Sequence, residues 1–306
     1  MRITLCMIVK DEAATLVECL HDIADLFDDI VVVDTGSSDA TREILRSRFG
    51  VETLTGKLDE QRCFSKSGAR NLGYARVKTP WILNLDADER ISRAQLARLL
   101  DLPDDSQVAG YFCRWDTHQH GVVIEDYKLA LFRCDIRASG CAHENAQIDL
   151  RRKRRQACWT DAIRIDHFPD QAKTEFKRRF YRERLLCALQ AEPHWYRYHW
   201  FLGYSYYRDG DMHEAHRYLS QAAESESATF PVECLNAKML LTCIYAARGE
   251  RNEALRVVDT AQAFHPRVAD DCEVQINFRM KPWLDAAQRR CRCGELNQIA
   301  PYAFYC

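Results

Sequence analysis

The sequence predicts an α/β domain with a Rossmann-like, mostly parallel sheet over residues 1–170, and an all-α region over residues 171–266. Two observations predict this order. In the first half, short β-branched runs alternate with helical patterns, which is typical of a parallel sheet covered by helices. Beyond about residue 171 the strand patterns stop, and small residues recur at the spacing of helical repeats. The tail, residues 267–306, has no clear pattern.

The elements of the first half follow the order β-α-β-α-β-α-β. Strands are expected in "RITLCMIV" (2–9), "DIVVVD" (29–34), "VETLTG" (51–56) and "WILNLD" (81–86). Residues 39–49 should form a helix capped by Asp39, and Ser92 should cap the helix after the last of these strands. One helix is also predicted over residues 13–27, and its apolar face would hold Leu16, Cys19, Leu20, Ile23 and Phe27.

The second half contains an internal repeat. Within residues 200–227 we find Leu202, Gly203, Tyr206, Gly210, Ala215, Leu219 and Ala222 at tetratricopeptide spacing, and a second copy follows 39 residues later, from Leu241 to Pro266. Two copies are fewer than the roughly three that a free solenoid needs. We therefore expect these helices to pack on the first domain, on the helix "KTEFKRRFYRERLLCALQ" or on a second subunit, which makes the helical region a candidate homodimer surface.

Composition excludes some classes of protein. The 43 basic and 45 acidic residues give a formal charge of -2, which argues against nucleic acid as a partner. No apolar run reaches the roughly 18 to 20 residues that cross a bilayer, and the start of the chain is a strand pattern, not a signal peptide.

The fourteen cysteines are scattered through apolar segments, so we expect a reduced, cytoplasmic protein. Cys272, Cys291, Cys293 and Cys306 could form a cluster, but their spacing matches no zinc knuckle.

Carboxylates gather where the predicted strands end. Asp34 ends the second strand, and Asp86 with Asp88 follows "WILNL". In a doubly wound sheet, ligands bind beyond the carboxyl ends of the strands. Two carboxylates at i and i+2 can hold one hard cation, Mg²⁺ or Mn²⁺, against a diphosphate. An isolated pair of this kind is more often a turn cap and a solvated surface residue, but its position after a buried strand favours the metal interpretation.

Five ordered motifs carry a family resemblance. The stretches "LCMIVKDEAATLVECL", "DIVVVDTGSSDATREI", "GARNLGYARVKTPWILNLDADE" and "LALFRCDIRASGCAHENAQ", followed by the repeats, resemble a family 2 glycosyltransferase of the GT-A fold with C-terminal tetratricopeptide repeats. The resemblance implies a metal-dependent, inverting transfer of a hexose from a nucleotide sugar, above all a UDP-sugar. The donor-binding residues that it implies are Val9, Lys10, Glu12, Asp34, Gly36, Ser37, Asp39, Arg70, Asn71, Asp86 and Ala87.

The resemblance also suggests residues for chemistry. Glu144 or Asp126 is the candidate base, and His143 would orient its neighbour or reach the metal. Asp88 and Asp86 are the candidate metal ligands. His167 in "RIDHFPD" is a further candidate ligand because it follows another apolar strand, or else it is a turn histidine before Pro169. Two departures matter little: "KDE" stands where relatives often have "KNE", and "GSSD" where Thr is common. The acidic pair Glu125 and Asp126 matches the family's acceptor-side motif only in approximate register, whereas "GCAHE" resembles the repeat-bearing relatives.

The acceptor is open on sequence grounds: a glycan, a lipid-linked sugar or a peptide side chain. The run Arg151–Arg155, with Lys177, Arg178, Arg179 and Arg182, is a solvated face, or it attracts an anionic partner: a phosphorylated lipid-linked sugar as acceptor or the inner face of the membrane. An alternative function is a repeat-based protein-binding scaffold with an inactive transferase domain. A nucleotidyltransferase is disfavoured because the sequence lacks a glycine-rich, basic phosphate loop near its start.

Overall fold

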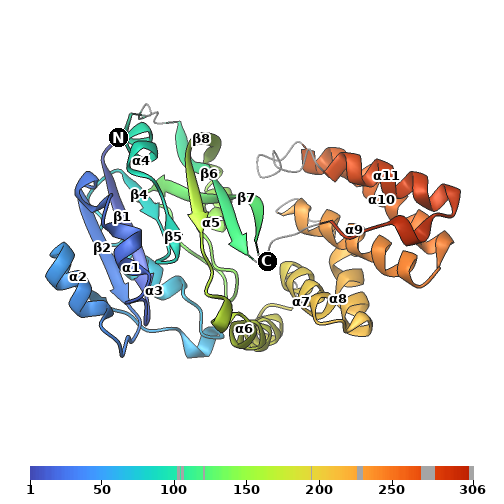
Figure 1. Ribbon diagram of the computed structural model, residues 1–306, viewed down its shortest axis with the longest axis horizontal. Helices are drawn as coiled ribbons and strands as arrows, with labels where there is room; N and C mark the ends of the chain where they lie inside the picture. The colour runs from blue at the N-terminus through green and yellow to red at the C-terminus, as the bar shows by residue number, and fades with distance from the viewer. Residues whose placement is uncertain are drawn as a thin grey trace. The chain divides into compact units, whose positions relative to one another are not determined.

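The computed structural model describes residues 1–101, 104, 107–119, 121–193, 195–225, 230–269 and 280–302, without the side chains of 171–178 and 269. The chain divides into two compact units, Met1–Thr174 and Glu175–Cys306 (Figure 1). In the described ranges we find no helix that is both long and apolar enough to cross a membrane.

The first unit is built on an eight-stranded sheet in the order β3-β2-β1-β4-β7-β6-β8-β5. The strands β1 (Ile3–Val9), β2 (Asp29–Asp34), β3 (Leu54–Thr55) and β4 (Trp81–Asn84) are parallel, as predicted. Val9 pairs with Asp34, so β1 and β2 end side by side. The side chains that follow these strands are therefore brought to one edge of the sheet.

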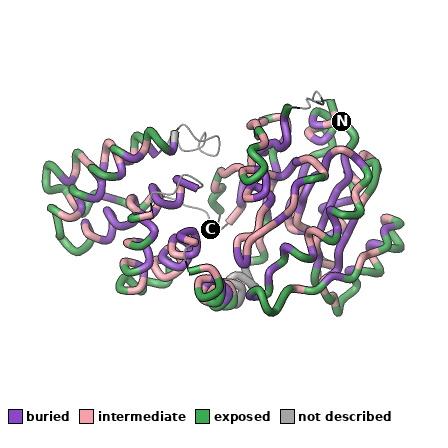
Figure 2. Tube along the Cα trace, turned by 180° about the vertical axis from the view of Figure 1, so that it is seen from behind, coloured by how far each residue is buried: buried purple, intermediate pink, exposed green. Residues whose placement is uncertain are grey.

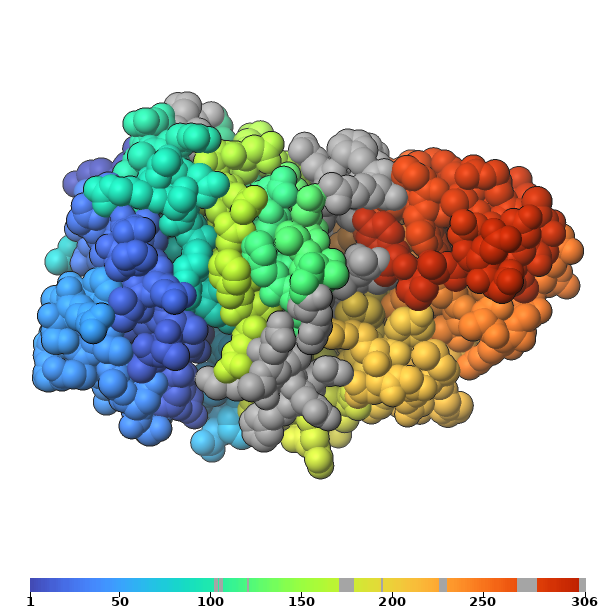
Figure 3. Space-filling model, in the orientation of Figure 1, coloured from blue at the N-terminus to red at the C-terminus, as the bar shows by residue number. Residues whose placement is uncertain are grey.

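The other half of the sheet is mixed. β7 (Val122–Arg133) runs antiparallel to β4 and to β6 (Val108–Gln119). β8 (Gln156–His167) is parallel to β6, and the short β5 (Glu89–Arg90) pairs antiparallel with the end of β8. Atoms of β7 and β8, green to yellow-green, reach the surface in Figure 3. These long strands carry half-exposed residues, which explains why their apolar pattern is weaker than that of β1 or β4.

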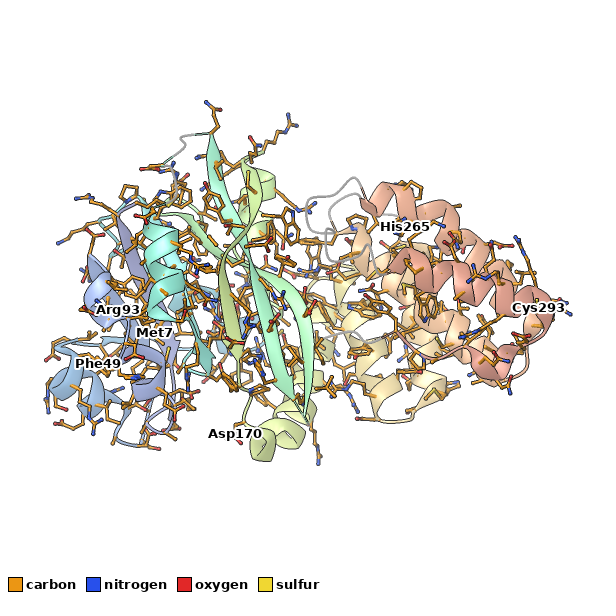
Figure 4. All side chains as sticks on the ribbon, turned by 45° about the horizontal axis from the view of Figure 1, so that its top comes forward. Met7, Phe49, Arg93, Asp170, His265 and Cys293 are labelled. Carbon is orange, nitrogen blue, oxygen red and sulfur yellow. The ribbon has the colours of Figure 1, made fainter. Side chains whose placement is uncertain are left out.

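Helices cover both faces of the sheet. α1 (Leu16–Leu20), α2 (Thr41–Phe49) and α4 (Arg93–Leu100) pack on the face of β1 that holds Ile3, Leu5 and Met7 (Figure 4). α3 (Ser67–Tyr74) and α5 (Gln147–Arg152) pack on the opposite face, around Cys6 and Ile82. Alternate residues of β1 thus point into two separate cores. The strands accordingly form the buried centre of this unit in Figure 2.

Two local predictions need correction. The single helix expected over residues 13–27 is wrong: α1 ends at Leu20, and a 3₁₀ turn follows at Ala24–Leu26. The backbone leaves helical geometry at Ile23, with φ of -125°, yet Leu16, Cys19, Leu20 and Ile23 are buried as predicted, and Phe27 is partly buried against the same core. α2 begins at Thr41 with Ala40 as its N-cap, one residue after the predicted cap, although Asp39 accepts a hydrogen bond from the Thr41 amide at 3.0 Å and another from the more distant Ala13 amide. The predicted cap Ser92 is confirmed and forms a capping box with Gln95.

The second unit is helical. It contains most of α6 (Gln171–Ala191), then α7 (Arg197–Arg208), α8 (Met212–Glu224), α9 (Pro231–Ala247) and α10 (Arg251–Ala269). The tail holds α11 (Met280–Cys293), a helix that the sequence pattern did not reveal. Gln262 and Gln288 bond Asp285 and Asp259 respectively, which ties α11 to α10. The apolar repeat positions Leu202, Ala215, Leu219, Ala222, Ala254, Val258 and Ala261 are fully buried.

The cysteines agree only in part with the expectation of a reduced chain. Ten of those in the described residues are free thiols, but Cys63 and Cys187 are disulfide-bonded, so the expectation is wrong for these two. In the tail, Cys291 is buried and Cys293 exposed, while Cys272 and Cys306 lie outside the described residues. Burial raises the pKa of the Cys6, Cys19 and Cys113 thiols to about 12, so these groups act as small apolar core residues.

Gly203 should be a close-packing position whose replacement lowers stability. A Cβ atom there would lie 2.7 Å from Cγ of Leu219 and 3.0 Å from the Leu219 amide nitrogen. Helix propensity alone favours Ala over Gly by about 1 kcal/mol, but overpacking costs about 1–3 kcal/mol. We expect Gly203→Ala to lower the midpoint of thermal unfolding of the helical unit, measured by circular dichroism.

Gly68 offers the matched control. It is an exposed glycine in α3, and a Cβ atom there would meet nothing within 4 Å. Gly68→Ala should leave stability unchanged or raise it. Equal effects of the two substitutions would show that α7 and α8 are not closely packed at Gly203.

Candidate functional site

The loops after β1 and β2 are held together by the predicted site residue Ser37 and by Asp11 and Ser38, which were not predicted as site residues. Asp11 has φ of 54°, a left-handed conformation that Asp and Asn tolerate better than most residues, which suits the "KDE" sequence. Its Oδ1 accepts hydrogen bonds from the amide of Ser38 at 2.7 Å and from the Ser38 hydroxyl at 3.0 Å. In return, the amide of Asp11 donates to Oγ of Ser37 at 2.9 Å. The two loops therefore form one rigid wall.

Other predicted donor-binding residues complete this wall. Asp39 accepts from the amide of Ala13 at 3.0 Å, and the amide of Glu12 donates to Oγ1 of Thr41 at 2.8 Å. Val9 is buried, while Lys10 beside it is exposed. The side chains of Ser37 and Asp39 thus shape the loops, and Lys10 extends from them into solvent.

Asp34 is a buried carboxylate with one oxygen satisfied and the other not. Oδ1 accepts from the amides of Gly36 at 2.8 Å and Ser37 at 2.9 Å, and from Nη2 of Arg42 at 2.6 Å. Oδ2 is buried and has no hydrogen-bond partner in the described residues. Gly36 has φ of 110°, which lets the backbone fold back onto Asp34. Buried polar atoms are rarely left unpaired, so Oδ2 is suited to accept a hydrogen bond from a ligand.

The same contacts keep the carboxyl group of Asp34 ionised. Burial alone would raise the pKa of this carboxyl, but the hydrogen bonds from Arg42, from the side chain and amide of Ser37 and from the amide of Gly36 outweigh burial and lower the pKa well below 3.8. Asp34 therefore stays ionised at neutral pH and can act only as an acceptor.

Arg70 connects α3 to the end of β4. Its Nη1 donates to Oδ1 of Asn84 at 2.7 Å and its Nη2 to Oδ1 of Asp86 at 3.0 Å, while the hydroxyl of Tyr74 also donates to Asn84 at 2.9 Å. Nζ of Lys128 lies 3.6 Å from Oδ2 of Asp86. Burial opposes ionisation of Asp86, but the charges of Arg70 and Lys128 prevail and lower its pKa. Asp86 is thus ion-paired on both of its oxygens.

Asn71 and Ala87 follow Arg70 and Asp86 directly in the sequence and have different structural roles. Nδ2 of Asn71 donates to the carbonyl of Ala138 at 2.9 Å, and its Oδ1 accepts from the amide of Ala138 at 2.8 Å. Asn71 thereby fixes the start of the segment that carries His143 and Glu144. Ala87 is buried between the two aspartates of the "DAD" triplet. Its small side chain allows the chain to turn between Asp86 and Asp88.

Asp88 and His167 form a second pair, with 3.5 Å between Oδ2 of Asp88 and Nε2 of His167. Nδ1 of His167 hydrogen-bonds Oγ1 of Thr117 at 3.0 Å, and Trp115 stacks on the imidazole ring. These contacts turn Nε2 toward Asp88, as in histidines that bind metals. The carboxylate of Asp88 suits Mn²⁺ or Mg²⁺ when phosphate and water complete the coordination, and the imidazole of His167 fits the transition metal Mn²⁺ better than Mg²⁺.

The predicted trio of metal ligands is not preformed. Both oxygens of Asp86 face the cations of Arg70 and Lys128, and the described part of the chain contains no group of three or more His, Cys, Asp or Glu that could hold a metal ion. Asp88 and His167 therefore remain as the pair that fits a cation, and Asp86 does not join them in this arrangement.

The candidate bases approach the site from two sides. Oε1 of Glu144 accepts from the amide of Lys66 at 2.7 Å, just before α3, the helix that carries Arg70. His143 has φ of 50°, a conformation that is rare for an L residue and common at functional sites. Asp126 lies on β7 opposite Trp115 and on the same face as Lys128, two residues along the strand. Glu144 and Asp126 both stay candidates.

Sequence reasoning missed Lys128, Trp115, Arg42 and the role of Glu89. Glu89 follows the "DAD" triplet directly and could have been examined as a third carboxylate. Lys128 and Trp115 had no comparable signal, because only the antiparallel pairing of β7 and β6 brings them to the end of β4.

The basic run Arg151–Arg155 is partly neutralised. Asp149 pairs with Arg152 and Lys153, and Asp135 lies 3.8 Å from Lys153 and 3.4 Å from Arg155. Arg179 pairs with Glu183 and Arg182 with Asp209. The side chains of Lys177 and Arg178 lie outside the described residues. A membrane contact through this run stays a prediction.

The fold and the site agree with one family. The family model described as glycosyl transferase family 2 matches residues 4–168, which is more than half of the 306 residues. The chain belongs to this family of glycosyltransferases. The matched range ends one residue after His167 and contains every predicted donor-binding, catalytic and metal-binding residue.

Individual relatives agree with both units. A TPR repeat-containing protein of Synechococcus elongatus is 29% identical over 235 residues, which are 72% of this chain and 56% of that protein. An uncharacterized glycosyltransferase of Rickettsia bellii is 30% identical over 92 residues, 30% of this chain and 29% of that one. The chain thus spans little more than half of one relative and less than a third of the other.

Among solved structures, residues 1–349 of S. aureus TarS in complex with UDP are 14% identical, with a TM-score of 0.47 over 96% of this chain and 92% of that one. This likeness is too low to support an argument about function.

The ion pair of Asp34 with Arg42 should give the first unit an acid-dependent stability. Because folding lowers the pKa of Asp34 from 3.8, its stabilising effect is complete above that pH and is lost as the pH falls below it. Asp34→Asn should therefore lower the urea midpoint at pH 7, and the difference from the unaltered protein should shrink below pH 3.8. Glu43→Gln, in an exposed pair with Arg46, is the control and should change little. A constant difference at every pH would contradict the role of the Asp34 charge.

Proposed function

We propose that the protein transfers a hexose from a nucleotide sugar, a UDP-sugar above all, to an acceptor with inversion at the anomeric carbon. The observation that carries this proposal is the buried, unpaired Oδ2 of Asp34 at the same sheet edge as Asp86 and Asp88, in a chain of glycosyltransferase family 2. Ligands of doubly wound sheets bind at this edge.

The donor would be bound at both sides of this edge. Oδ2 of Asp34 would accept a hydrogen bond from the uracil or a ribose hydroxyl, because an ionised carboxylate can only accept. The wall formed by Asp11, Ser37 and Asp39 would fix the position of the nucleoside. Arg70, held by Asn84 and Asp86, would face the diphosphate with a charge that cannot be lost.

The charges of the site explain why a cation would be needed. Arg70 and Lys128 are matched by Asp86 and Glu89, so this cluster offers a diphosphate no surplus of positive charge. Asp88 and His167 would hold Mn²⁺ or Mg²⁺, and Thr117 would keep Nε2 of His167 available for this purpose. When bound, such a cation neutralises the diphosphate as its bond to the sugar breaks.

A carboxylate would take the proton of the acceptor. Glu144 is fixed by the Lys66 amide on the α3 side, and Asp126 faces the site from β7. Either group can remove the proton if it comes within hydrogen-bond reach of the acceptor atom. The strained backbone of His143 would set the direction of Glu144, its neighbour in sequence.

The helical repeats would select the acceptor, a glycan, a lipid-linked sugar or a peptide, and are also the candidate surface for a homodimer. The proposed location is the cytoplasm, at or near the inner face of the membrane; the ten free thiols of the described residues support it, and the bonded Cys63 and Cys187 oppose it. The other candidate function is a protein-binding scaffold with an inactive transferase unit. The unpaired Asp34 oxygen and the Asp88–His167 pair favour the enzyme.

Removal of the metal or of Asp88 should abolish turnover of the donor. With a panel of UDP-sugars and Mn²⁺, we expect slow release of UDP from one donor, which EDTA suppresses. Asp88→Ala should lower the rate about 100-fold or more, since several kcal/mol of charge stabilisation is lost. Asp22→Ala, at an exposed aspartate, is the control. If no nucleotide raises the melting temperature and no donor is consumed, the scaffold function is favoured instead.

A second experiment distinguishes the two candidate bases. Glu144→Gln and Asp126→Asn keep size and polarity but cannot take a proton at neutral pH. The base should be the residue whose replacement lowers transfer to acceptors in cell extract about 10²- to 10⁴-fold, with unchanged affinity for UDP measured by calorimetry. Mass spectrometry of the extract identifies the product. Full activity of both variants would rule out both residues.

A further inference from the structure

Glu89 is a buried carboxylate that joins several parts of the candidate site. Its side chain is 1% exposed. Oε1 accepts from Nε1 of Trp115 and from Nζ of Lys128, both at 2.7 Å, and Oε2 accepts from the amide of Asp86 at 2.9 Å and from the same Nζ at 2.7 Å. Each oxygen therefore has two donors, one of them the shared ammonium group.

These contacts connect Glu89 both to the turn that carries Asp86 and to His167. On one side, Glu89 holds the backbone of Asp86, and Lys128 also lies 3.6 Å from the Asp86 carboxylate. On the other side, the backbone of Glu89 pairs with His167 between β5 and β8, and Trp115 stacks on the His167 ring at 4.8 Å between centroids and an angle of 18°. One carboxylate thus fixes the "DAD" turn relative to the imidazole.

Stability alone does not account for a charged group here. Burying an ion pair gives little or no advantage over an apolar pair of the same size, because the charges lose their hydration. An apolar side chain could fill the space but could not accept from the Asp86 amide, the Trp115 indole and the Lys128 ammonium together. The identity of residue 89 is therefore explained by the geometry that it imposes.

We propose that Glu89 is a positioning residue that, through Trp115 and the Asp86 amide, sets the relative placement of His167 and the Asp86–Asp88 turn for cation and diphosphate binding. This inference rests on the proposed function, and it extends that function to residues that do not touch the substrate. Trp115 acts with Glu89 as a single unit, because its indole N–H fixes the ring that supports His167.

Glu89→Gln tests the proposal with little change in volume. The indole of Trp115 and the amide of Asp86 donate to different oxygens of Glu89, so in glutamine one of these two donors would face the NH₂ group instead of an acceptor. In the full chain with saturating UDP, the dissociation constant of Mn²⁺ is measured from the electron paramagnetic resonance of free Mn²⁺. We expect 10- to 100-fold weaker binding, the usual effect of losing a group that orients metal ligands. Glu18→Gln, at an exposed partner of Arg90, is the matched control and should bind Mn²⁺ normally.

A double-mutant cycle separates positioning from a merely structural role. Trp115→Phe keeps a ring on His167 but loses the N–H, and it should weaken Mn²⁺ binding less than Glu89→Gln. If the two residues act as one unit, the double variant should be no weaker than Glu89→Gln alone. A structural role predicts a lower melting temperature with an unchanged Mn²⁺ dissociation constant for the folded protein, and that result would overturn the inference.

The same measurements keep the two proposals apart. If the unaltered protein binds no Mn²⁺ with UDP, the proposed function fails, and this inference fails with it. If the unaltered protein binds both, and Glu89→Gln binds them equally well, only the inference is overturned. Additive effects of Glu89→Gln and Trp115→Phe would likewise contradict their action as one unit.

Discussion

The parallel pairing of β1 with β2 and β4 is the constraint on which the site depends. Val9 pairs with Asp34, and Cys6 pairs with Asn84 before the amide of Leu85 donates back to Cys6 at 3.3 Å. Because these pairings align the strand ends, the "TGSS" turn and the "DAD" turn leave the sheet at one edge. A shift of register by one residue would turn Asp34 from its buried position toward the opposite face.

Charge balance governs what this edge can bind. The buried Asp34 and Glu89 and the partly exposed Asp86 each have a cation beside the carboxylate: Arg42 for Asp34, Arg70 for Asp86 and Lys128 for Glu89. Burial without such partners would drive these groups to their neutral forms. Two groups at this edge can contact a ligand. The acceptor oxygen Oδ2 of Asp34 suits a neutral hydrogen-bond donor such as an imide or hydroxyl, and the Asp88–His167 pair suits a cation.

Much of the fold of the first unit could be predicted from the sequence, because the patterns that identify its strands involve residues close together in the chain. The runs at β1, β2 and β4 are apolar enough to be recognised as buried strands, and the aspartates that end β2 and follow β4 identify the functional edge. Leu16, Cys19 and Leu20 were recognised as core residues even though the helix that carries them is shorter than expected. Periodicity identifies a buried face better than it identifies the end of a helix, because tertiary packing decides where the helix stops.

The sequence by itself determined the two-part organisation, the strand ends that carry the site and the likeness to glycosyltransferase family 2, because these depend on residues close together in the chain. Only the tertiary structure decided that Asp86 is ion-paired, that His167 faces Asp88, and that Glu89, Trp115 and Lys128 support both. The ion pair of Asp86 with Arg70 spans 16 positions, whereas the other contacts join residues 26 to 79 positions apart through the antiparallel pairings of β4 with β7, β6 with β7 and β5 with β8 and the parallel pairing of β6 with β8. No local sequence pattern predicts these contacts, since they depend on the register of strands that are distant in sequence.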